Sequence, residues 1–273
     1  GSNPVTPTNL FFGPGSIMKH SQIALQLYTL RDHLTTPADI AASLTKVKAA
    51  GYDAVQVSGV GPIDPKELKS IMEGEGIECC ATHEPGDMIL DSPESVVEKL
   101  GILGCRYTAY PYPAGIDMTD TEQVDTLIRK LDAAGKVLAE NGCVLTYHNH
   151  SIEFLRSQGK PVLERIYNET SPQHLQAEID TYWVQHGGGD PVAWCARLQN
   201  RLPLLHLKDY GINAEKQPVM KEIGKGNLNW PAIIHAAESS GCEWYIVEQD
   251  TCPTDPFDSI AQSYSSLTTL CKE

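Results

Sequence analysis

Eight short apolar runs rich in β-forming residues recur along the chain, and segments with helical character separate them. The runs are Ile23–Thr29, Asp53–Ser58, Ile77–His83, Cys105–Tyr110, Cys143–His148, His174–Asp180, Pro203–Asp209 and Glu243–Glu248. Some, such as Val144–Tyr147, show little polar alternation, which is typical of strands buried on both faces. Eight strand–helix repeats without a glycine-rich dinucleotide motif after the first strand predict an α/β fold, a closed (β/α)8 TIM barrel rather than an open doubly wound sheet.

The segments between the runs carry helix start and stop signals. A capping side chain followed by proline occurs at Thr36-Pro37, Asp64-Pro65, Ser92-Pro93, Asp190-Pro191 and Asp255-Pro256. The clearest amphipathic helix is expected from about Thr121 to Glu140. Helix ends are expected at Gly51, Gly76, Gly142 and Gly241. The longest loop, Tyr210 to Leu228, precedes the seventh helix and is expected to help cover a site.

Length and charge limit the domain organisation and the partners. Barrels of this kind need roughly 250 residues, so the 273 residues of the chain predict one barrel domain over residues 18–273. Gly1–Ile17 lacks the features of a signal peptide, and we expect it to be a leader outside the fold. The net charge of −14 argues against a nucleic-acid partner. No apolar run approaches the roughly 20 residues of a membrane span, so no membrane partner is expected.

The cysteine pattern indicates the compartment. None of the eight cysteines forms a C-x-x-C pair, and several fall in the apolar runs. Small buried thiols of this kind are typical of a reducing environment. We therefore expect a cytoplasmic protein.

Polar residues end four successive runs in the second half of the chain. These residues are His148 and His150, Asp180, His206 and Glu248. Active sites of TIM barrels lie at the carboxyl ends of the strands, where these side chains would meet. Mixed imidazole and carboxylate ligands suit a divalent metal ion, so the sequence predicts a metal centre at this rim.

Four strings around these residues resemble a known family. They are LTYHNHSIEF (145–154), EIDTYWV (178–184), LLHLKDYG (204–211) and YIVEQD (245–250). The chain from about Gln22 onward resembles the sugar phosphate isomerase/epimerase group of the xylose-isomerase-like TIM barrel superfamily. The resemblance implies one divalent metal (Mn, Zn, Co, Fe, Ni or Mg) held by Asp180, His206 and Glu248. The fourth ligand position, commonly a glutamate, is matched by His148.

The resemblance implies an enzyme that acts on a small sugar or polyol. A metal-dependent isomerase or epimerase would form an enediolate after loss of an α-proton. Candidate groups for proton transfer and charge stabilisation are Glu248, His148, His150, Lys208 and His83. Candidate substrate contacts are Glu153, Trp183, Glu84 and Tyr28.

Several alternatives remain open in the sequence. His148 resembles the inosose dehydratase branch, so a dehydratase or lyase is the second candidate. An endonuclease IV-like phosphodiesterase, the third candidate, would need more histidines than can be placed at this rim. A non-catalytic carbohydrate-binding barrel is the fourth candidate. Lys208 is read either as a catalytic cation or as a salt-bridge partner of Asp209, and a homo-oligomer is left open.

Overall fold

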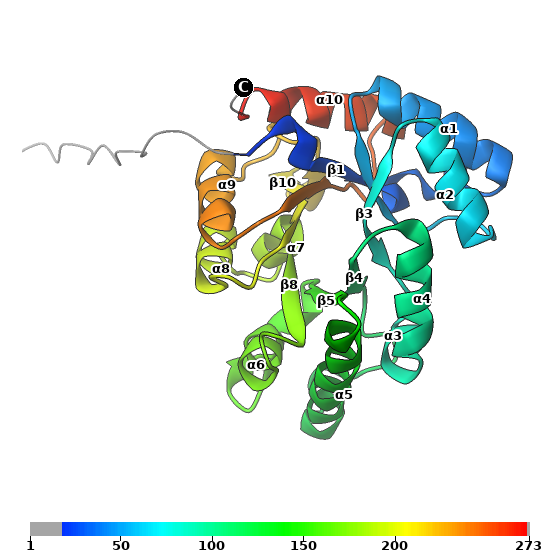
Figure 1. The fold of residues 1–273 in the computed structure, drawn as a ribbon. Coiled ribbons are helices and arrows are strands. Elements are labelled where there is room, and N and C mark those ends of the chain that lie inside the picture. The colour runs from blue at the N-terminus through cyan, green and yellow to red at the C-terminus, as the bar shows by residue number, and fades with distance from the viewer. Residues whose placement is uncertain (1–17, 272–273) are drawn as a thin grey trace, which may run out of the picture.

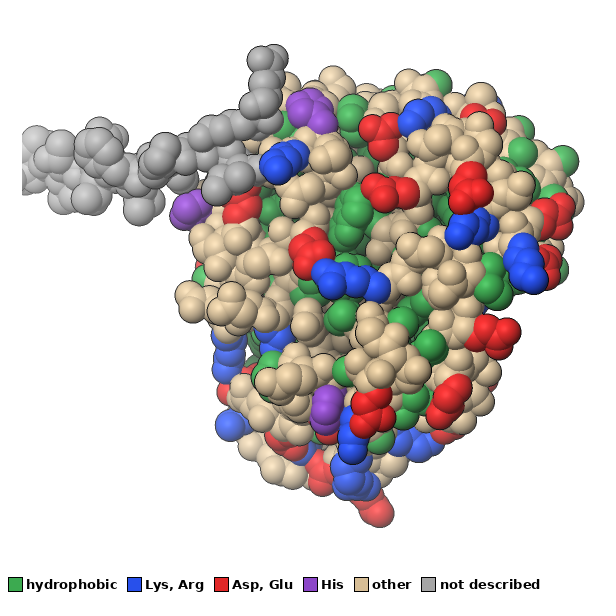
Figure 2. All heavy atoms as spheres, viewed as in Figure 1, with side chains coloured by type: hydrophobic (Ala, Val, Ile, Leu, Met, Phe, Trp, Pro, Cys, Tyr) green, Lys and Arg blue, Asp and Glu red, His purple; other side chains and the backbone are tan. Residues whose placement is uncertain are grey.

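The computed structural model describes residues 18–271. The predicted leader, Gly1–Ile17, therefore lies outside the described residues. Within the described range, no helix combines the length and the apolar character that a membrane span requires. On the face seen in Figure 2, acidic and basic side chains of the described residues are intermixed.

Eight parallel strands close into a barrel, and helices surround it (Figure 1). Neighbouring strands follow chain order, and the first strand pairs with the last to close the barrel. The strands are β1 (Ile23–Gln26), β2 (Ala54–Val57), β3 (Glu78–His83), β4 (Tyr107–Tyr110), β5 (Val144–His148), β8 (Leu175–Asp180), β9 (Leu204–Leu207) and β12 (Trp244–Val247). Each lies within one of the eight predicted runs, and the predicted TIM barrel is confirmed.

Ten α-helices surround the strands among the described residues. They are α1 (Pro37–Ala49), α2 (Pro65–Gly74), α3 (Gly86–Asp91), α4 (Pro93–Leu103), α5 (Thr121–Glu140), α6 (Val162–Glu169), α7 (Thr181–His186), α8 (Pro191–Arg197), α9 (Trp230–Ser239) and α10 (Pro256–Thr268). Of these, α1, α2, α4, α8 and α10 begin where the proline signals predicted. Four of the five predicted caps accept a backbone N–H of the first turn. The prediction was wrong for Ser92, which makes no such bond because the residue also ends α3 and its backbone is not extended.

Side-chain alternation along the strands divides the barrel interior into layers. A small apolar cluster fills the lower interior, and it contains Ala24, Ala54, Cys80, Ala81, Tyr107, Leu204 and Ile246. The larger apolar core lies between the strands and the surrounding helices. Successive residues of a strand face opposite sides of the sheet. The residues two positions after Ala24, Ala54, Leu204 and Ile246 therefore also point into the barrel. These residues are polar and buried: Gln26, Gln56, His206 and Glu248.

Short helices and strand pairs follow the carboxyl ends of several barrel strands. They are the 3-10 helices η2 (Leu27–His33) and η3 (Ile152–Phe154) and the two-stranded pairs β6 (Arg156–Ser157) with β7 (Lys160–Pro161) and β10 (Asp209–Ile212) with β11 (Pro218–Lys221). A further 3-10 helix, η1 (His20–Gln22), precedes β1. The predicted loop Tyr210 to Leu228 thus contains an antiparallel hairpin, because main-chain pairing satisfies backbone groups that a bare loop would leave to water.

Asp209 fixes the segment that follows β9. Its carboxylate is fully buried and accepts the backbone N–H groups of Gly224, Gly226 and Leu228 and the indole N–H of Trp230. A carboxylate with so many donors is well compensated for its burial. The same contacts tie the hairpin to the start of α9.

Two helical glycines provide a matched test of the packing. A Cβ added at Gly135 in α5 would lie 2.0 Å from the backbone oxygen of His174, whereas one added at exposed Gly101 in α4 would meet nothing within 4 Å. We expect Gly135→Ala to cost about 1–3 kcal/mol through overpacking. Gly101→Ala should stabilise the protein by up to about 1 kcal/mol through helix propensity. Urea unfolding measures both, and equal effects would contradict the packing argument.

Candidate metal and substrate site

The predicted site residues lie at the carboxyl ends of β5, β8, β9 and β12. Glu178 and Asp180 are two residues apart on β8, and His206 and Lys208 are two apart at the end of β9. Residues spaced by two point to the same side of a strand. All four of these side chains are at most 1% exposed. The strand ends therefore project two levels of polar side chains into the upper interior of the barrel.

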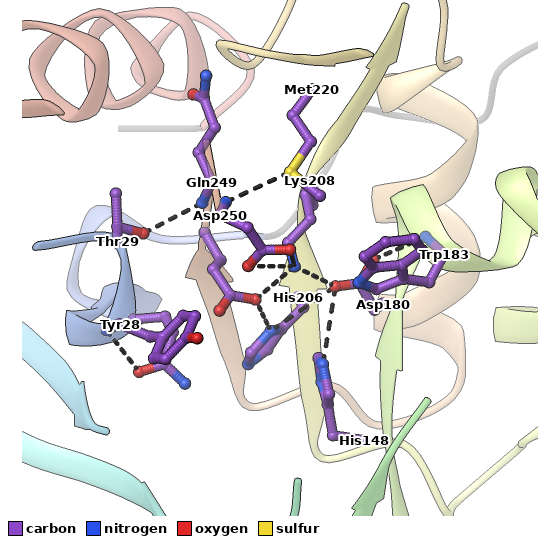
Figure 3. Close-up of polar contacts among 12 residues, drawn as sticks. Tyr28, Thr29, His148, Asp180, Trp183, His206, Lys208, Met220, Gln249 and Asp250 are labelled. Carbon is purple, nitrogen blue, oxygen red and sulfur yellow. Dashed lines mark hydrogen bonds and ion pairs between the residues drawn. The ribbon is translucent and has the colours of Figure 1, made fainter. Parts of the chain in front are cut away.

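The four predicted metal ligands lie together, and we call them the outer group: His148, Asp180, His206 and Glu248. One ligand atom from each lies within 4.8 Å of the others. The distance from His206 Nδ1 is 2.9 Å to Glu248 Oε2 and 4.0 Å to Asp180 Oδ2. His148 Nε2 lies 3.9 Å from the same oxygen of Asp180 (Figure 3). The structure thus places two imidazoles and two carboxylates around a common point.

Lys208 contributes the cation of this cluster (Figure 3). Its Nζ lies 3.0 Å from Asp180 Oδ2, 2.7 Å from Glu248 Oε2 and 3.2 Å from either oxygen of Asp250. The alternative pairing with Asp209 is wrong, because the carboxylate of Asp209 is occupied by the hairpin. One ammonium thus faces three carboxylates here.

Burial and neighbouring charges shift the titration of these groups. Burial raises the pKa of Asp180 to about 6, although Lys208 and His206 act in the opposite direction. Burial also acts to raise the pKa of Glu248, but Lys208 and His206 outweigh it and hold that pKa well below its usual value. For His206, burial is outweighed by Glu178 and Glu248, and the pKa rises to about 10. Glu248 is therefore ionised at neutral pH.

The outer group fits a divalent ion on the chemistry of its donors. Asp180 Oδ2 is fully buried and has no hydrogen-bond partner among the described residues, although the Lys208 ammonium lies nearby. A buried carboxylate oxygen without a hydrogen bond needs a compensating partner. Two imidazoles and two carboxylates are a ligand set that transition metals accept.

A second cluster, which we call the inner group, lies directly beneath: Glu178, His83, His148 and His206. Glu178 Oε1 lies 2.5 Å from His83 Nε2 and 3.0 Å from His206 Nε2. His148 Nδ1 is 3.3 Å away, but the angle excludes a hydrogen bond. Sequence reasoning did not select Glu178 as a site residue. Its spacing of two from Asp180 is the signal that could have found it.

The contacts of three predicted site residues, His83, His150 and Trp183, indicate what each side chain can do. Both ring nitrogens of His83 face buried partners, Glu178 and the side chain of Gln26. Burial and the charge of Lys208 lower the pKa of His150 to about 3, so its imidazole is neutral. Trp183 packs against His150 with ring centroids 5.4 Å apart, and it is not among the residues that line the pocket. Trp183 therefore supports the site from behind, whereas His83 lines the pocket with both ring nitrogens already paired.

Glu153 lies behind the turn that follows β5. It is fully buried, and its two oxygens accept the hydroxyl of Tyr147 and the backbone N–H of His150. It does not line the pocket, so the structure gives no support to the expected substrate contact. Burial raises the pKa of Glu153 to about 7. Its position indicates that it holds the turn carrying His150.

A pocket of about 790 Å³ opens above the outer group. Its floor includes His148, Lys208 and Glu248, and its wall includes the predicted contacts Tyr28 and Glu84. The other lining residues are Arg31, Val57, Ser58, Gly59, Val60, His83, Pro85, Lys99, Pro111, Tyr112, His150, Asp250 and Thr251. Two lining tyrosines, Tyr28 and Tyr112, remain 40% and 48% exposed. The pocket therefore combines a charged floor with aromatic rings at its mouth.

Comparison with known proteins identifies sequence relatives. A family model described as xylose isomerase-like TIM barrel matches residues 44–270. The chain is 25% identical over 167 residues to the inosose dehydratase of Geobacillus thermodenitrificans, a match that covers 55% of each protein. It is 22% identical over 244 residues to the rhizopine catabolism protein MocC of Rhizobium meliloti, which covers 77% of this chain and 74% of MocC. The first of these relatives is thus matched over just over half of its length.

Solved structures share the fold at low identity. A sugar phosphate isomerase/epimerase from Parabacteroides distasonis has a TM-score of 0.77 at 22% identity and covers 93% of this chain and 95% of its own. An L-ribulose 3-epimerase has a TM-score of 0.71 at 13% identity, with 91% and 94% covered. A xylose isomerase-like TIM barrel protein from Mycobacterium smegmatis, in complex with magnesium, has a TM-score of 0.72 at 13% identity, with 91% and 96% covered.

The raised pKa of Glu153 predicts a pH-dependent stability. A carboxyl group whose pKa is higher in the folded state stabilises the fold below about pH 4.5, and this contribution is lost as the pH rises through about 7. Glu153→Gln removes the ionisation and can keep both hydrogen bonds. We expect the variant to be more stable than the wild type by about 1–3 kcal/mol at pH 8 and equally stable at pH 4.5. Urea unfolding at the two pH values tests this, and a difference that does not change with pH would contradict it.

Proposed function

The chain belongs to the xylose isomerase-like TIM barrel family, and we propose that it is a metal-dependent enzyme that transfers a proton at the carbon next to the carbonyl group of a sugar or keto-polyol. The observation that carries the proposal is the outer group beside Lys208, because His148, Glu248 and Lys208 line the pocket. Isomerisation or epimerisation follows when the proton returns to a different position. The outer group would hold the ion.

The residues of the floor supply the groups for proton transfer. The bound ion would supply positive charge that stabilises the negative charge developing on a substrate oxygen. Glu248 is ionised and lines the pocket, so it is the candidate for accepting the proton. The pKa of Lys208 is raised, chiefly because Asp180 and Glu248 outweigh its burial. Its ammonium therefore stays charged and can stabilise the same developing negative charge.

The walls of the pocket support a sugar-like substrate. A volume of about 790 Å³ lies within the range of small-molecule sites. The rings of Tyr28 and Tyr112 offer apolar faces, while Glu84, Lys99 and Asp250 offer hydrogen-bonding groups. An aromatic surface next to polar groups suits a ring that has C–H faces and hydroxyl edges. The proposed substrate is thus a small polyhydroxylated carbonyl compound.

Dehydration is the second candidate, and two observations favour it. A symmetric exchange of protons between two opposed glutamates is not available, since the β5 position carries His148, which is neutral because burial and the nearby His206 lower its pKa. Several sequence relatives are named inosose dehydratase. Loss of a β-hydroxyl after the first proton transfer would give a dehydratase from the same residues. The early chemistry is shared by both candidates.

The metal site can be tested by removing ligands. We expect Asp180→Ala and His206→Ala to lose nearly all bound divalent metal, because each removes one of four ligands and disturbs its neighbours. Elemental analysis of protein loaded with Mn²⁺ or Zn²⁺ and then desalted measures the metal content, and circular dichroism checks the fold. His174→Ala, a partly exposed histidine paired with Asp132 outside the site, is the matched control. Full metal content in both site variants would refute the assignment.

Proton transfer can be tested without knowing the final product. In D2O, the wild type should catalyse exchange of a hydrogen next to the carbonyl group of a keto-sugar or keto-inositol, observed by NMR. Glu248→Gln should lower the exchange rate by about 10²–10⁴-fold, the usual contribution of a general base. Release of water from the substrate would identify the dehydratase outcome. A wild type that binds these substrates without exchange would contradict the proposed chemistry.

A further inference from the structure

The polar side chains beneath the outer group form a chain whose hydrogen-bond directions can be assigned. The starting point is a backbone donor, the N–H of Tyr28, which donates to Gln26 Oε1. This contact fixes which end of the Gln26 amide is the oxygen. Gln26 Nε2 therefore donates to Gln56 Oε1, at 2.8 Å, and lies 3.3 Å from His83 Nδ1. Because the amide nitrogen of Gln26 is a donor, the Nδ1 atom of His83 must be the acceptor.

The assignment continues through Gln56 to the two histidines. Gln56 Nε2 donates to Glu178 Oε2 at 2.7 Å, so Gln56 Oε1 is an acceptor. His206 Nε2 lies 2.6 Å from this oxygen and 3.0 Å from Glu178 Oε1. Both of these neighbours are acceptors, so His206 Nε2 carries a hydrogen. His83 accepts at Nδ1 and therefore carries its hydrogen at Nε2, which donates to Glu178 Oε1 at 2.5 Å.

We infer that Glu178 is the positioning residue of the metal centre. It accepts the amide N–H of Gln56, whose oxygen accepts the hydrogen of His206 Nε2, and its own carboxylate lies 3.0 Å from the same nitrogen, so that Nδ1 of the ring faces the outer group. The inference rests on the proposed function. Metal-binding histidines commonly donate their second N–H to a carboxylate, which fixes the tautomer and the orientation of the ring. Here the buried carboxylate of Glu178 binds His83 directly and orients Gln56, and the oxygen of Gln56 is the hydrogen-bond acceptor of His206 Nε2.

The geometry assigns Glu178 to support rather than to direct ligation. The inner group is internally paired: Glu178 Oε1 with His83 and His206, and Glu178 Oε2 with Gln56. The buried oxygen without a hydrogen bond, Asp180 Oδ2, belongs to the outer group. Glu248 of the outer group lines the pocket, and so does His83 of the inner group, but both ring nitrogens of His83 are already paired. An ion that enters from the pocket therefore meets open donor atoms in the outer group.

Cobalt binding provides the test. Metal-free protein is titrated with Co²⁺, and both the dissociation constant and the visible d–d spectrum are recorded. We expect Glu178→Gln to weaken Co²⁺ binding about 10–100-fold, the usual effect of losing such a supporting carboxylate, and to alter the spectrum. The matched control is Glu222→Gln, a buried glutamate that bonds Ser259 outside the site and should bind as the wild type does.

The outcomes separate the inference from the proposed function. A wild type that does not bind Co²⁺ overturns the metal centre itself. A Glu178→Gln variant with the affinity and spectrum of the wild type overturns the role of Glu178. Loss of binding in Glu178→Gln with retention in Asp180→Asn also overturns it, because the ion would then lie in the inner group.

A second variant covers the case in which Glu178→Gln does not fold. Gln56→Met keeps the side-chain length but removes the other acceptor on His206 Nε2 and the donor to Glu178. It should weaken Co²⁺ binding several-fold without preventing it, because His206 Nε2 loses its hydrogen bond to Gln56 but keeps the nearby Glu178 carboxylate. Unchanged binding in Gln56→Met would contradict the assigned chain of hydrogen bonds.

Discussion

A carboxylate inside a barrel must be paired or lose its charge, and this constraint governs the upper interior of the protein. Burying an ion without partners costs several kcal/mol. Glu178 keeps its charge because imidazoles and an amide donor surround it, and its pKa lies well below the usual value although burial acts to raise it. Asp180 has fewer partners, and its pKa rises to about 6. Glu178, which has more hydrogen-bond partners, lies deeper in the barrel. Asp180, which has an oxygen without a hydrogen bond, lies where an ion could reach it.

The barrel was predictable from the sequence because its signals are local and repeated. The run His174–Asp180 shows this, since β8 begins one residue later and ends at the same aspartate. Proline after a capping residue gave the start of α8 and α10. The hairpin after β9 was not predictable, because it depends on hydrogen bonds to Asp209. The carboxylate of Asp209 accepts N–H groups from residues up to 21 positions away. No local pattern encodes such contacts.

The sequence predicted which residues at the strand ends form the site, but not the contacts that surround them. Asp180, His206 and Glu248 follow the rule that polar residues at the carboxyl ends of barrel strands converge. Glu153 was expected near the substrate, but its distance from the pocket depends on how the turn after β5 folds back. Gln26 and Gln56 lie within apolar runs and read as ordinary strand residues. Only the closed barrel shows that Gln26 contacts His83 and that Gln56 contacts His206, which is 150 positions away.

The adjacency of Lys208 and Asp209 has a consequence for how such a barrel can diversify. Lys208 turns inward to the carboxylates of the floor, while Asp209 turns outward and anchors the hairpin at its base. The tip of the hairpin, residues 213–217, makes no contribution to that anchor. Its length and sequence can therefore drift during evolution while the lysine keeps its place. A lineage can in this way acquire new recognition at the rim and retain the old chemistry beneath it.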